Sequence, residues 1–542
     1  MRALPPGETP SGVEPAAGED EPRMTMLPSC PAPANDSSPG AAADAGLRVR
    51  LAADPPHLDP LDESSEVTAQ VLWGLVHEPL LVCGGRPPSG GSGAVDASGR
   101  RAPEPTPGLA SRWQLSPGGD VITLQLRPGA LFHDGHAVTS TDVRATLETV
   151  WHGSGRMPQA RAALADLAAI ELSGADALRL RLKRAAPIVL RALCDVPIVP
   201  AGWLSSRRPG APARDPVGSG PYRFVSWQKG KSLRLARAAR PGLPPAPLAE
   251  IVFSVETDTG RALGQLRRGG LDLIPRLDGV HFPDQVRPAA LGPGLDLLGL
   301  ATERTTFLAV NHRKPPLSVP VFRRALSLLW DRAGLAEEIH RGLATPIAVP
   351  PFADLPAPPF DPALAAQLLR EAALVAPAPL LKGRPVAIQH RLTLIHSGGR
   401  IATAELRRLA ERLRRLGILL ELIALEPGPL AERLRTGQFD LALLSWTSRP
   451  FEDPRPRFAS GGPFNFGGFR SPRLDALLEE MRALDGPNTR PDLDRRLGLL
   501  MAEELPAIFL YRHTDLALAA TRVRGLCNDG GRLDFSRAGF AP

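Results

Sequence analysis

Residues 391–445, RLTLIHSGGRIATAELRRLAERLRRLGILLELIALEPGPLAERLRTGQFDLALLS, decide the fold. Short apolar runs alternate here with segments whose apolar residues are spaced as on one face of a helix. The predicted elements, in order, are strand 391–395, helix 402–416, strand 419–425, helix 430–436 and strand 440–445. Strands joined by helices in this order pack as a mostly parallel sheet with helices on its faces. The sequence therefore predicts an α/β unit here.

Outward from this unit the pattern is more mixed. Strands are predicted where apolar and polar residues alternate, and helices where apolar residues have helical spacing. The predicted strands are 47–52, 121–126, 177–182, 271–274, 307–310 and 507–512, with an antiparallel pair, 221–227 and 232–236, joined by the turn 228–231. The predicted helices are 65–76, 139–150, 261–268, 319–330, 361–373, 474–484 and 491–505. Mixed strands early and the α/β unit later predict a multi-lobed α/β protein.

Length and composition are those of a large globular protein. The chain has 542 residues, 43% of them hydrophobic and 22% charged, which suggests about three to five folding units or fewer large ones. It contains no run of about 18 uncharged apolar residues, so a membrane span is excluded. The net charge is +7, but the arginines are scattered through amphipathic helices such as 405–415. Without interleaved aromatic residues, this distribution predicts no nucleic-acid partner.

The first 46 residues differ from the rest. They contain nine prolines, many Gly and Ala residues, and seven acids against two bases, so we predict that this segment is disordered. Residues 27–30, LPSC, resemble the end of a bacterial lipoprotein signal, which would make Cys30 a lipidation site and residues 31–46 a tether. Residues 1–26 lack the apolar stretch that such a signal requires. Either the true start lies elsewhere, or Cys30 is an ordinary linker cysteine.

The other cysteines are Cys83, Cys194 and Cys527. No pair has CxxC spacing, so neither a zinc site nor a thioredoxin-like site is predicted. Four cysteines allow three complete pairings, and sequence does not choose among them. Free buried thiols are the expectation for most of the four.

Two short motifs resemble catalytic or cofactor-binding sequences, but each lacks a residue that the chemistry requires. His133 and His136 sit on a turn beside Pro128-Gly129, and no third metal ligand is near them in sequence. Gly230-Lys231-Ser232 imitates the end of a P-loop, but residue 225 is valine rather than the opening glycine. No nucleophile elbow, HExxH sequence or dinucleotide-binding glycine pattern is present. We therefore expect no enzyme activity, no cofactor and no metal.

A series of longer motifs occurs in order along the chain. LASRW at 109–113, LRPGALFHDG at 126–135 and VTSTDV at 138–143 resemble the signature region of the family 5 extracellular solute-binding proteins, the oligopeptide, dipeptide and nickel binding components of ABC importers. Further similar motifs are LDP at 58–60, EPLL at 78–81, GSGPY at 218–222, VN at 310–311, KPP at 314–316, RRAL at 323–326, DR at 331–332, FD at 439–440, WT at 446–447, NF at 465–466 and ELP at 504–506. Together they cover about residues 47–520.

The resemblance implies an α/β fold of the large two-lobed periplasmic-binding-protein type II class, with an extra small domain. Lobe I would comprise 47–82, 195–300 and 505–542. The small additional domain would be 83–194, and lobe II would be 301–504. The ligand would be enclosed between the lobes, which close like a hinge.

The resemblance also suggests ligand-binding residues. Trp446, Thr447 and Ser448 begin a loop at the carboxyl end of the last strand of the α/β unit, where open α/β sheets place ligands. Trp446 is the expected apolar wall, or else a core tryptophan at a strand end. In the peptide-binding members an Asp three residues after this Trp pairs with the ligand's ammonium group. Here that position is Arg449, which would instead favour a carboxylate or phosphate.

Nearby acids leave two interpretations open. Glu452 and Asp453 either take over the contact to an amine or pair with Arg449, Arg455 or Arg457. Resemblance to the nickel-binding members suggests two further wall regions, one at Asp62-Glu63 and one at Trp151–Arg156; a surface loop is the alternative for both. The additional candidate contacts are therefore Glu63, Trp151 and Arg156.

The function implied by the resemblance is capture, without covalent chemistry, of a peptide-like or other small amphipathic solute and its delivery to an ABC permease in the inner membrane. A monomer is expected, in the periplasm or at the outer face of the cell membrane, although no standard signal peptide is visible. A soluble sensor on the same fold is the alternative, and a hydrolase is less favoured.

Overall fold

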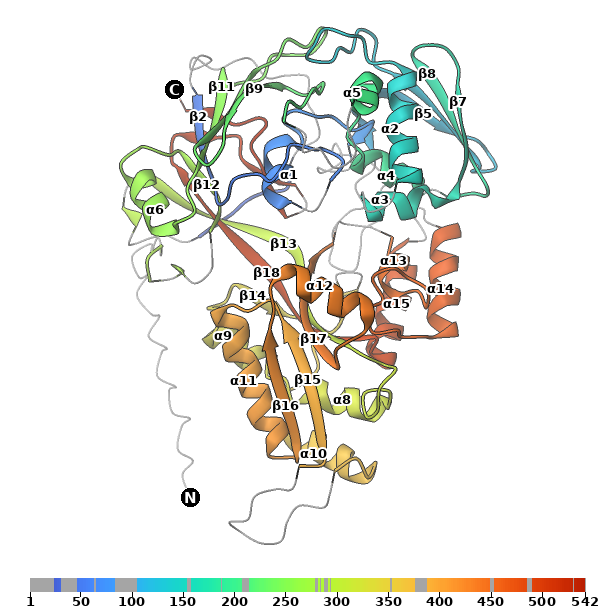
Figure 1. Cartoon of the computed structure of the whole chain (residues 1–542), viewed down its shortest axis with the longest axis vertical. Helices are drawn as coiled ribbons and strands as arrows, with labels where there is room; N and C mark the ends of the chain where they lie inside the picture. Colours follow the sequence, from blue (N-terminus) through green and yellow to red (C-terminus); the bar gives the residue numbers. More distant parts are fainter. Residues whose placement is uncertain are drawn as a thin grey trace, which may run out of the picture.

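The computed structural model describes residues 24–30, 46–62, 65–82, 105–153, 157–186, 188–206, 214–277, 281–282, 284–286, 291–292, 294–350, 353–375, 388–448, 453–484, 490–529 and 531–541. It has two lobes, and a small domain lies beside the first of them (Figure 1). No helix in these ranges is both long and apolar enough to cross a bilayer.

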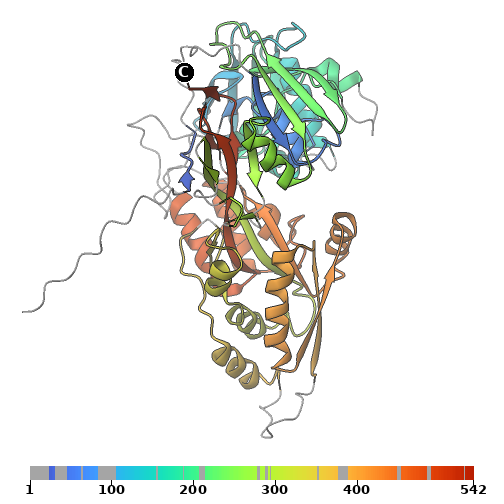
Figure 2. The ribbon, with the colours of Figure 1, turned by 90° about the vertical axis from the view of Figure 1, so that its left-hand side faces the viewer.

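Two long strands run from one lobe into the other. They are β13 (Leu295–Val310) and β18 (Ala507–Ala520), which are antiparallel neighbours at the centre of a 12-stranded sheet. The strand order is β16-β15-β17-β13-β18-β12-β2-β11-β10-β9. The side view in Figure 2 shows these strands passing between the lobes. Their register shifts between Ala301 and Thr305, so the ladder is interrupted where the lobes join, which is the place expected for a hinge.

Lobe II contains the α/β unit predicted from residues 391–445. Its strands are β15 (His390–His396), β16 (Ile418–Ala424) and β17 (Leu441–Thr447), and β15 is parallel to both of the others. One face of the sheet is covered by α8 (Pro320–Leu328), α9 (Arg332–Glu338), α10 (Pro362–Glu371) and α11 (Arg400–Arg414). The opposite face is covered by α12 (Pro427–Thr436), α13 (Arg455–Phe458), α14 (Pro472–Ala483) and α15 (Arg490–Glu504). The predicted α/β unit is therefore confirmed.

Lobe I holds the other half of the long sheet. Its strands are β2 (Gly46–Leu51), β9 (Tyr222–Gln228), β10 (Ser232–Arg237), β11 (Glu250–Val255) and β12 (Leu273–Leu277). The predicted antiparallel pair 221–227 and 232–236 appears as β9 and β10. The helices are α1 (Glu66–Leu72), capped by the Ser65 side chain, and α6 (Thr259–Arg267). The short strand β14 (Ala344–Pro346) pairs with β18, and β19 (Val523–Arg524), β20 (Cys527–Asp529), β21 (Arg532–Asp534) and β22 (Gly539–Phe540) form two small hairpin-like pairs.

The small domain is built around a four-stranded antiparallel sheet. Its strand order is β5-β6-β8-β7, with β5 (Ala110–Leu115), β6 (Val121–Leu126), β7 (Leu167–Leu172) and β8 (Ala177–Leu182). Helices α2 (Ser140–His152), α3 (Pro158–Ala163), α4 (Val189–Asp195) and α5 (Ala201–Ser206) accompany it, and β3 (Leu81–Val82) pairs with β4 (Thr106–Pro107). Helix α2 begins at a capping box of Thr139 and Asp142. The residue boundaries between the three parts remain a prediction.

The N-terminal segment contradicts the prediction of disorder over residues 24–30. Strand β1 (Thr25–Met26) pairs in parallel with Leu298 and Gly299 of β13. Cys30 forms a disulfide with Cys527. Composition alone missed this order because a short paired strand and a covalent bond offset the entropy of a segment with little apolar surface.

The expectations for the cysteines are wrong as well. The Cys30 sulfur is bonded to Cys527, so it has no thiol to carry a lipid. Cys194 is disulfide-bonded too, which overturns the expectation of free buried thiols. Asp534 lies close to Cys30 and Cys527, but two sulfurs bonded to each other are not the thiolates that a metal requires. Cys30, Cys527 and Asp534 are therefore a disulfide with a neighbouring acid rather than a metal site.

Close backbone packing joins lobe I to the small domain and explains the GSGPY motif. A Cβ at Gly218 would lie 1.9 Å from the Val76 carbonyl oxygen, and one at Gly220 would lie 2.4 Å from that of Leu75. Only glycine allows this approach. From the small domain, the His133 N–H donates to the Gly218 carbonyl at 2.8 Å, and His133 Nε2 lies 3.0 Å from the Gly220 oxygen.

His77 is buried at the same junction, with only 1% of its surface exposed. Burial, together with a smaller effect of the neighbouring His133, lowers the pKa of His77 to about 3. The folded chain therefore keeps this imidazole neutral at pH values at which the unfolded chain protonates it, because the ordinary pKa is about 6.5.

We predict that acid destabilises this junction through His77. Stability from a lowered histidine pKa is present above pH 6.5 and is lost as pH falls toward 3, at up to about 1.4 kcal/mol per pH unit. His77→Gln should flatten the dependence of the urea unfolding midpoint on pH between about 7 and 5. The exposed His136→Gln serves as the control and should keep the wild-type slope. Equal slopes in wild type and His77→Gln would contradict this account.

The disulfide of Cys30 gives a second prediction. Replacing both Cys30 and Cys527 by Ser should lower stability by about 2–4 kcal/mol, seen as a lower midpoint in guanidinium unfolding, since the bond closes a loop spanning 497 positions. Iodoacetamide labelling of the native wild-type chain should leave both cysteines unmodified. Labelling at either position without reductant would refute the bond.

Candidate functional site

Trp446 lies near the end of β17, where this strand approaches lobe I. Antiparallel pairing places Trp446 opposite Thr305 of β13, next to the interrupted part of the ladder. The strand ends at Thr447. The predicted wall residue therefore stands beside the strands about which the lobes would move.

The indole of Trp446 rests on a cluster of aromatic rings. The ring centre of Phe307 is 4.0 Å away, and that of Phe458 is 5.6 Å away. The Arg457 guanidinium lies over the indole at 4.6 Å, an attractive geometry for a cation on a tryptophan face. Trp446 itself is only half-buried. One part of the ring is thus fixed by lobe II, and another part remains open to solvent.

Two polar atoms at this position are buried without a hydrogen-bond partner among the described residues. They are Trp446 Nε1 and Thr305 Oγ1. Cross-strand pairing puts the two side chains on the same face of the sheet. A buried donor or acceptor left unpaired costs about 1–3 kcal/mol, so these atoms favour a bound molecule or water with polar groups.

Among the described strands, none pairs with part of one edge of β17. Strand β15 pairs only with Leu441, Ala442 and Leu443. Beyond Leu443, no described strand lies on that edge, while β13 occupies the other edge as far as Thr447. An exposed strand edge can accept an extended peptide as an added strand.

The loop after Trp446 is held by α13. Arg457 Nη1 donates to Ser448 Oγ at 2.9 Å, and Arg457 Nη2 donates to the Thr447 carbonyl at 3.4 Å. Ser448 is buried and its hydroxyl is engaged by this arginine, whereas Thr447 is exposed. Of the two predicted contacts, only Thr447 therefore presents its side chain to solvent.

The remaining predicted residues are distributed differently. Trp151 is partly buried against the core of the small domain, with its ring stacked on His152 at 4.3 Å. Glu63, Arg156, Arg449 and Glu452 lie outside the described residues. Asp453 pairs with Arg455, with contacts of 2.7–3.0 Å. Of the two interpretations offered for this acid, the structure therefore has pairing with a neighbouring arginine.

Sequence reasoning missed the supporting side chains of the site. Thr305 and Phe307 come from a strand whose first half was not predicted, and Arg457 was considered only as a partner for the acids. No local sequence pattern identifies them, because only cross-strand pairing and the turn into α13 bring them to Trp446.

The other face of the same strands carries a chain of hydroxyl and imidazole groups. Exposed Ser445 lies 2.6 Å from Thr306 Oγ1, which lies 2.7 Å from His513 Nε2. Burial lowers the pKa of His513 to about 2, helped by the nearby Arg304 and His340. His513 is therefore a neutral structural group at physiological pH and ties β18 to β13.

The sequence of this chain is similar to those of known bacterial solute-binding proteins. Residues 104–467 match the sequence profile of the bacterial extracellular solute-binding proteins, family 5 Middle. A probable di/tripeptide-binding protein 5 of Pseudomonas aeruginosa (strain UCBPP-PA14) is 26% identical over 469 residues, covering 80% of this chain and 86% of the relative. A heme-binding protein A of Haemophilus influenzae (strain ATCC 51907 / DSM 11121 / KW20 / Rd) is 23% identical, covering 77% and 81%.

The architecture also matches solved structures. A dipeptide-binding protein of Pseudoalteromonas sp. SM9913, determined in complex with Met-Leu, aligns with a TM-score of 0.73 at 18% identity, covering 92% of this chain and 100% of that one. This similarity supports the two-lobed type II periplasmic-binding-protein fold.

Arg457 should set the rigidity of the site. Arg457→Met removes the donors to Ser448 and Thr447, and hydrogen bonds from a charged group are worth about 1.5–3 kcal/mol, so backbone amide exchange over residues 446–448 should become at least roughly tenfold faster. Hydrogen-exchange mass spectrometry measures this change. Arg470→Met, at an exposed arginine, is the control. Unchanged exchange in Arg457→Met would show that the guanidinium does not hold the loop.

Proposed function

Since its match over residues 104–467 makes this chain a member of the family 5 bacterial extracellular solute-binding proteins, we propose that it captures a peptide-like or other small amphipathic solute between its lobes and delivers it to an ABC permease. The family is one of solute-binding proteins, and we propose that this member performs no covalent chemistry. A single polypeptide chain would suffice for capture, so we propose a monomer.

The observation that carries the proposal is a pair of buried atoms, Trp446 Nε1 and Thr305 Oγ1, that have no hydrogen-bond partner among the described residues and lie beside a strand edge that no described strand covers. A peptide supplies both features that this arrangement lacks. Its backbone can hydrogen-bond to the edge of β17 beyond Leu443, and its polar groups can satisfy the two atoms. The partly exposed indole offers an apolar surface for an adjacent side chain.

The chemistry of the solute's charged end is proposed from Arg449. A guanidinium at this position favours a carboxylate or phosphate and disfavours an ammonium group. We propose that Arg449 contacts an acidic group of the solute, and that Thr447, Glu63, Trp151 and Arg156 line the remaining wall. The names of the relatives cover di/tripeptides and heme, and a peptide-like solute with an acidic group has the backbone that β17 can pair with.

The proposed location is the periplasm or the outer face of the cell membrane. The Cys30–Cys527 bond and the disulfide-bonded Cys194 support it, because disulfides persist in oxidising compartments and are rare in the cytosol. The permease partner would then lie in the adjacent membrane.

Native mass spectrometry of protein purified without denaturation tests the proposal. We expect a stoichiometric adduct of peptide-like mass, and its loss in Trp446→Ala, because truncation removes both the apolar wall and the Nε1 donor. Trp227→Ala is the matched control, since Trp227 lies on β9 and donates to Asp54 at 3.0 Å, remote from β17 in the strand order.

Two results would overturn the proposal. One is the absence of any adduct together with no binding, by calorimetry, of a panel of di- and tripeptides, including ones with acidic side chains. The other is repeated turnover of such a peptide by the purified chain, which would support a hydrolase instead.

A further inference from the structure

The small domain and lobe II meet at a buried ion pair. Asp166, at the end of a short turn of helix before β7, accepts hydrogen bonds from Arg482 Nη1 of α14 on both carboxylate oxygens, each at 3.2 Å. The two side chains are 6% and 5% exposed. They are separated by 316 positions in the chain, so the contact belongs to the tertiary arrangement of the two bodies.

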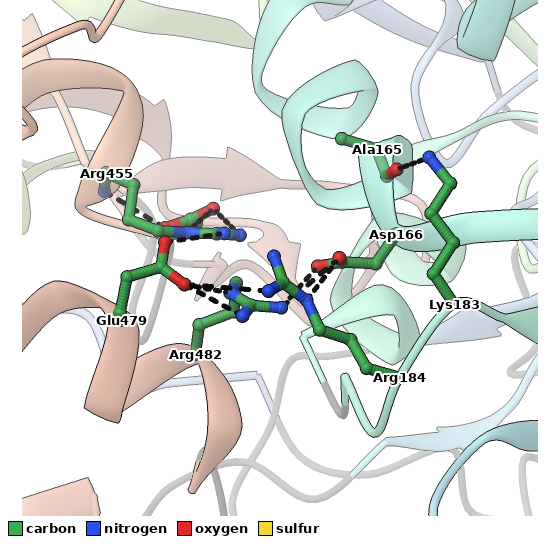
Figure 3. A network of polar contacts seen from close by, with 8 residues as sticks. Ala165, Asp166, Lys183, Arg184, Arg455, Glu479 and Arg482 are labelled. Carbon is green, nitrogen blue, oxygen red and sulfur yellow. Dashed lines mark hydrogen bonds and ion pairs between the residues drawn. The ribbon is translucent and has the colours of Figure 1, made fainter.

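A second arginine and a second acid complete the contact. Arg184, which follows β8, donates from Nε to Asp166 at 3.0 Å and lies 3.9 Å from Glu479 of α14. Arg482 in turn donates from Nε to Glu479 at 2.9 Å. Two positive and two negative groups therefore alternate across the boundary, as Figure 3 shows, and the buried Asp166 and Arg482 each have a charged partner.

The position of this contact matters for movement of the lobes. Strands β13 and β18 connect the lobes on one side of the molecule, and α14 meets the small domain on another (Figure 1). A rotation about the interrupted ladder between Ala301 and Thr305 would carry α14 away from the small domain. The Asp166–Arg482 pair can therefore form in only one relative arrangement of the lobes.

The contact is also linked to the candidate site. Arg455 of α13 lies 3.9 Å from Glu479 and is paired with Asp453, at the far end of the loop that follows Trp446. The same short helix carries Arg457, whose guanidinium lies over Trp446. A continuous set of charged contacts thus leads from the loop beside Trp446 to the boundary with the small domain.

We propose that Asp166, Arg184, Glu479 and Arg482 form an ionic latch that holds lobe II against the small domain. The proposal rests on the proposed function only in that the arrangement it holds is the one enclosing the solute. An ionic contact suits a reversible latch, because charges exposed on opening regain water, whereas an exposed apolar face would not.

Small-angle X-ray scattering of the full chain, with no peptide added, tests the latch. Asp166→Asn and Arg482→Gln should each increase the radius of gyration relative to wild type. The double variant should expand no further than either single variant, because both act on the same contact.

The matched control is Arg473→Gln. Arg473 lies on the same helix and pairs with Glu503 of α15, within lobe II, with both side chains exposed. It should keep the wild-type radius. Arg184→Gln provides a second probe, since Arg184 is 54% exposed and its loss should expand the chain less than Arg482→Gln. Thermal unfolding of each variant verifies that it is folded.

An unchanged radius in Arg482→Gln, or an additive expansion in the double variant, would overturn the latch. These measurements use no ligand, so their result is separate from that for solute capture. A chain with an intact latch that retains no solute would refute the proposed function alone, and a chain that retains solute without a latch would refute this inference alone.

Discussion

The pairing of β13 with β18 is the constraint on which the rest of the structure depends. Both strands belong to both lobes, so the two lobes share one sheet rather than a flexible linker. Their ladder shifts register between Ala301 and Thr305, and again between Thr306 and Phe307. At the interruption, Thr302 Oγ1 donates to the His513 carbonyl at 2.6 Å. A movement of the lobes relative to each other would therefore centre on this short region.

The same strands also position the candidate site. Because β17 pairs with β13 up to Thr447, Trp446 is delivered to the edge of lobe II nearest the junction. Buried polar groups at the boundary between the lobes differ in whether the protein supplies them with hydrogen-bond partners. Asp166 and Arg482 are fully paired with protein groups, whereas Trp446 Nε1 and Thr305 Oγ1 have none among the described residues. In our proposals, the first pair holds lobe II against the small domain, and the second pair gains its hydrogen-bond partners from the bound solute.

Local patterns predicted the elements whose contacts are local or periodic. The strands predicted at 121–126 and 177–182 have the bounds of β6 and β8. The long strands were recognised only at 307–310 and 507–512. Their other halves contain polar residues such as Glu303, Arg304 and Asp515, which serve the junction and break the apolar alternation.

Only part of the candidate site, and none of the disulfide bonding, was predicted, because most of these contacts join residues that are distant in the sequence. Trp446 was identified because its position follows a strand and matches the family motif. Thr305 and Arg457 were not identified, since only cross-strand register and the turn into α13 bring them to the indole. The Cys30–Cys527 bond was equally out of reach, because four cysteines permit three pairings and no local pattern chooses one.

The order of strands in the sheet also dictates when the protein can fold during its synthesis. Lobe I needs β18 beside β12, and the core of lobe II needs Ile508, Leu510 and Tyr511 from the same strand. Neither lobe can be completed until the ribosome has made β18, and Cys30 cannot form its disulfide before Cys527 has been made. Only the small domain draws its sheet and helices from one contiguous stretch. Both lobes therefore depend on contacts between segments far apart in the sequence, which form slowly and leave apolar surface exposed until β18 has been made.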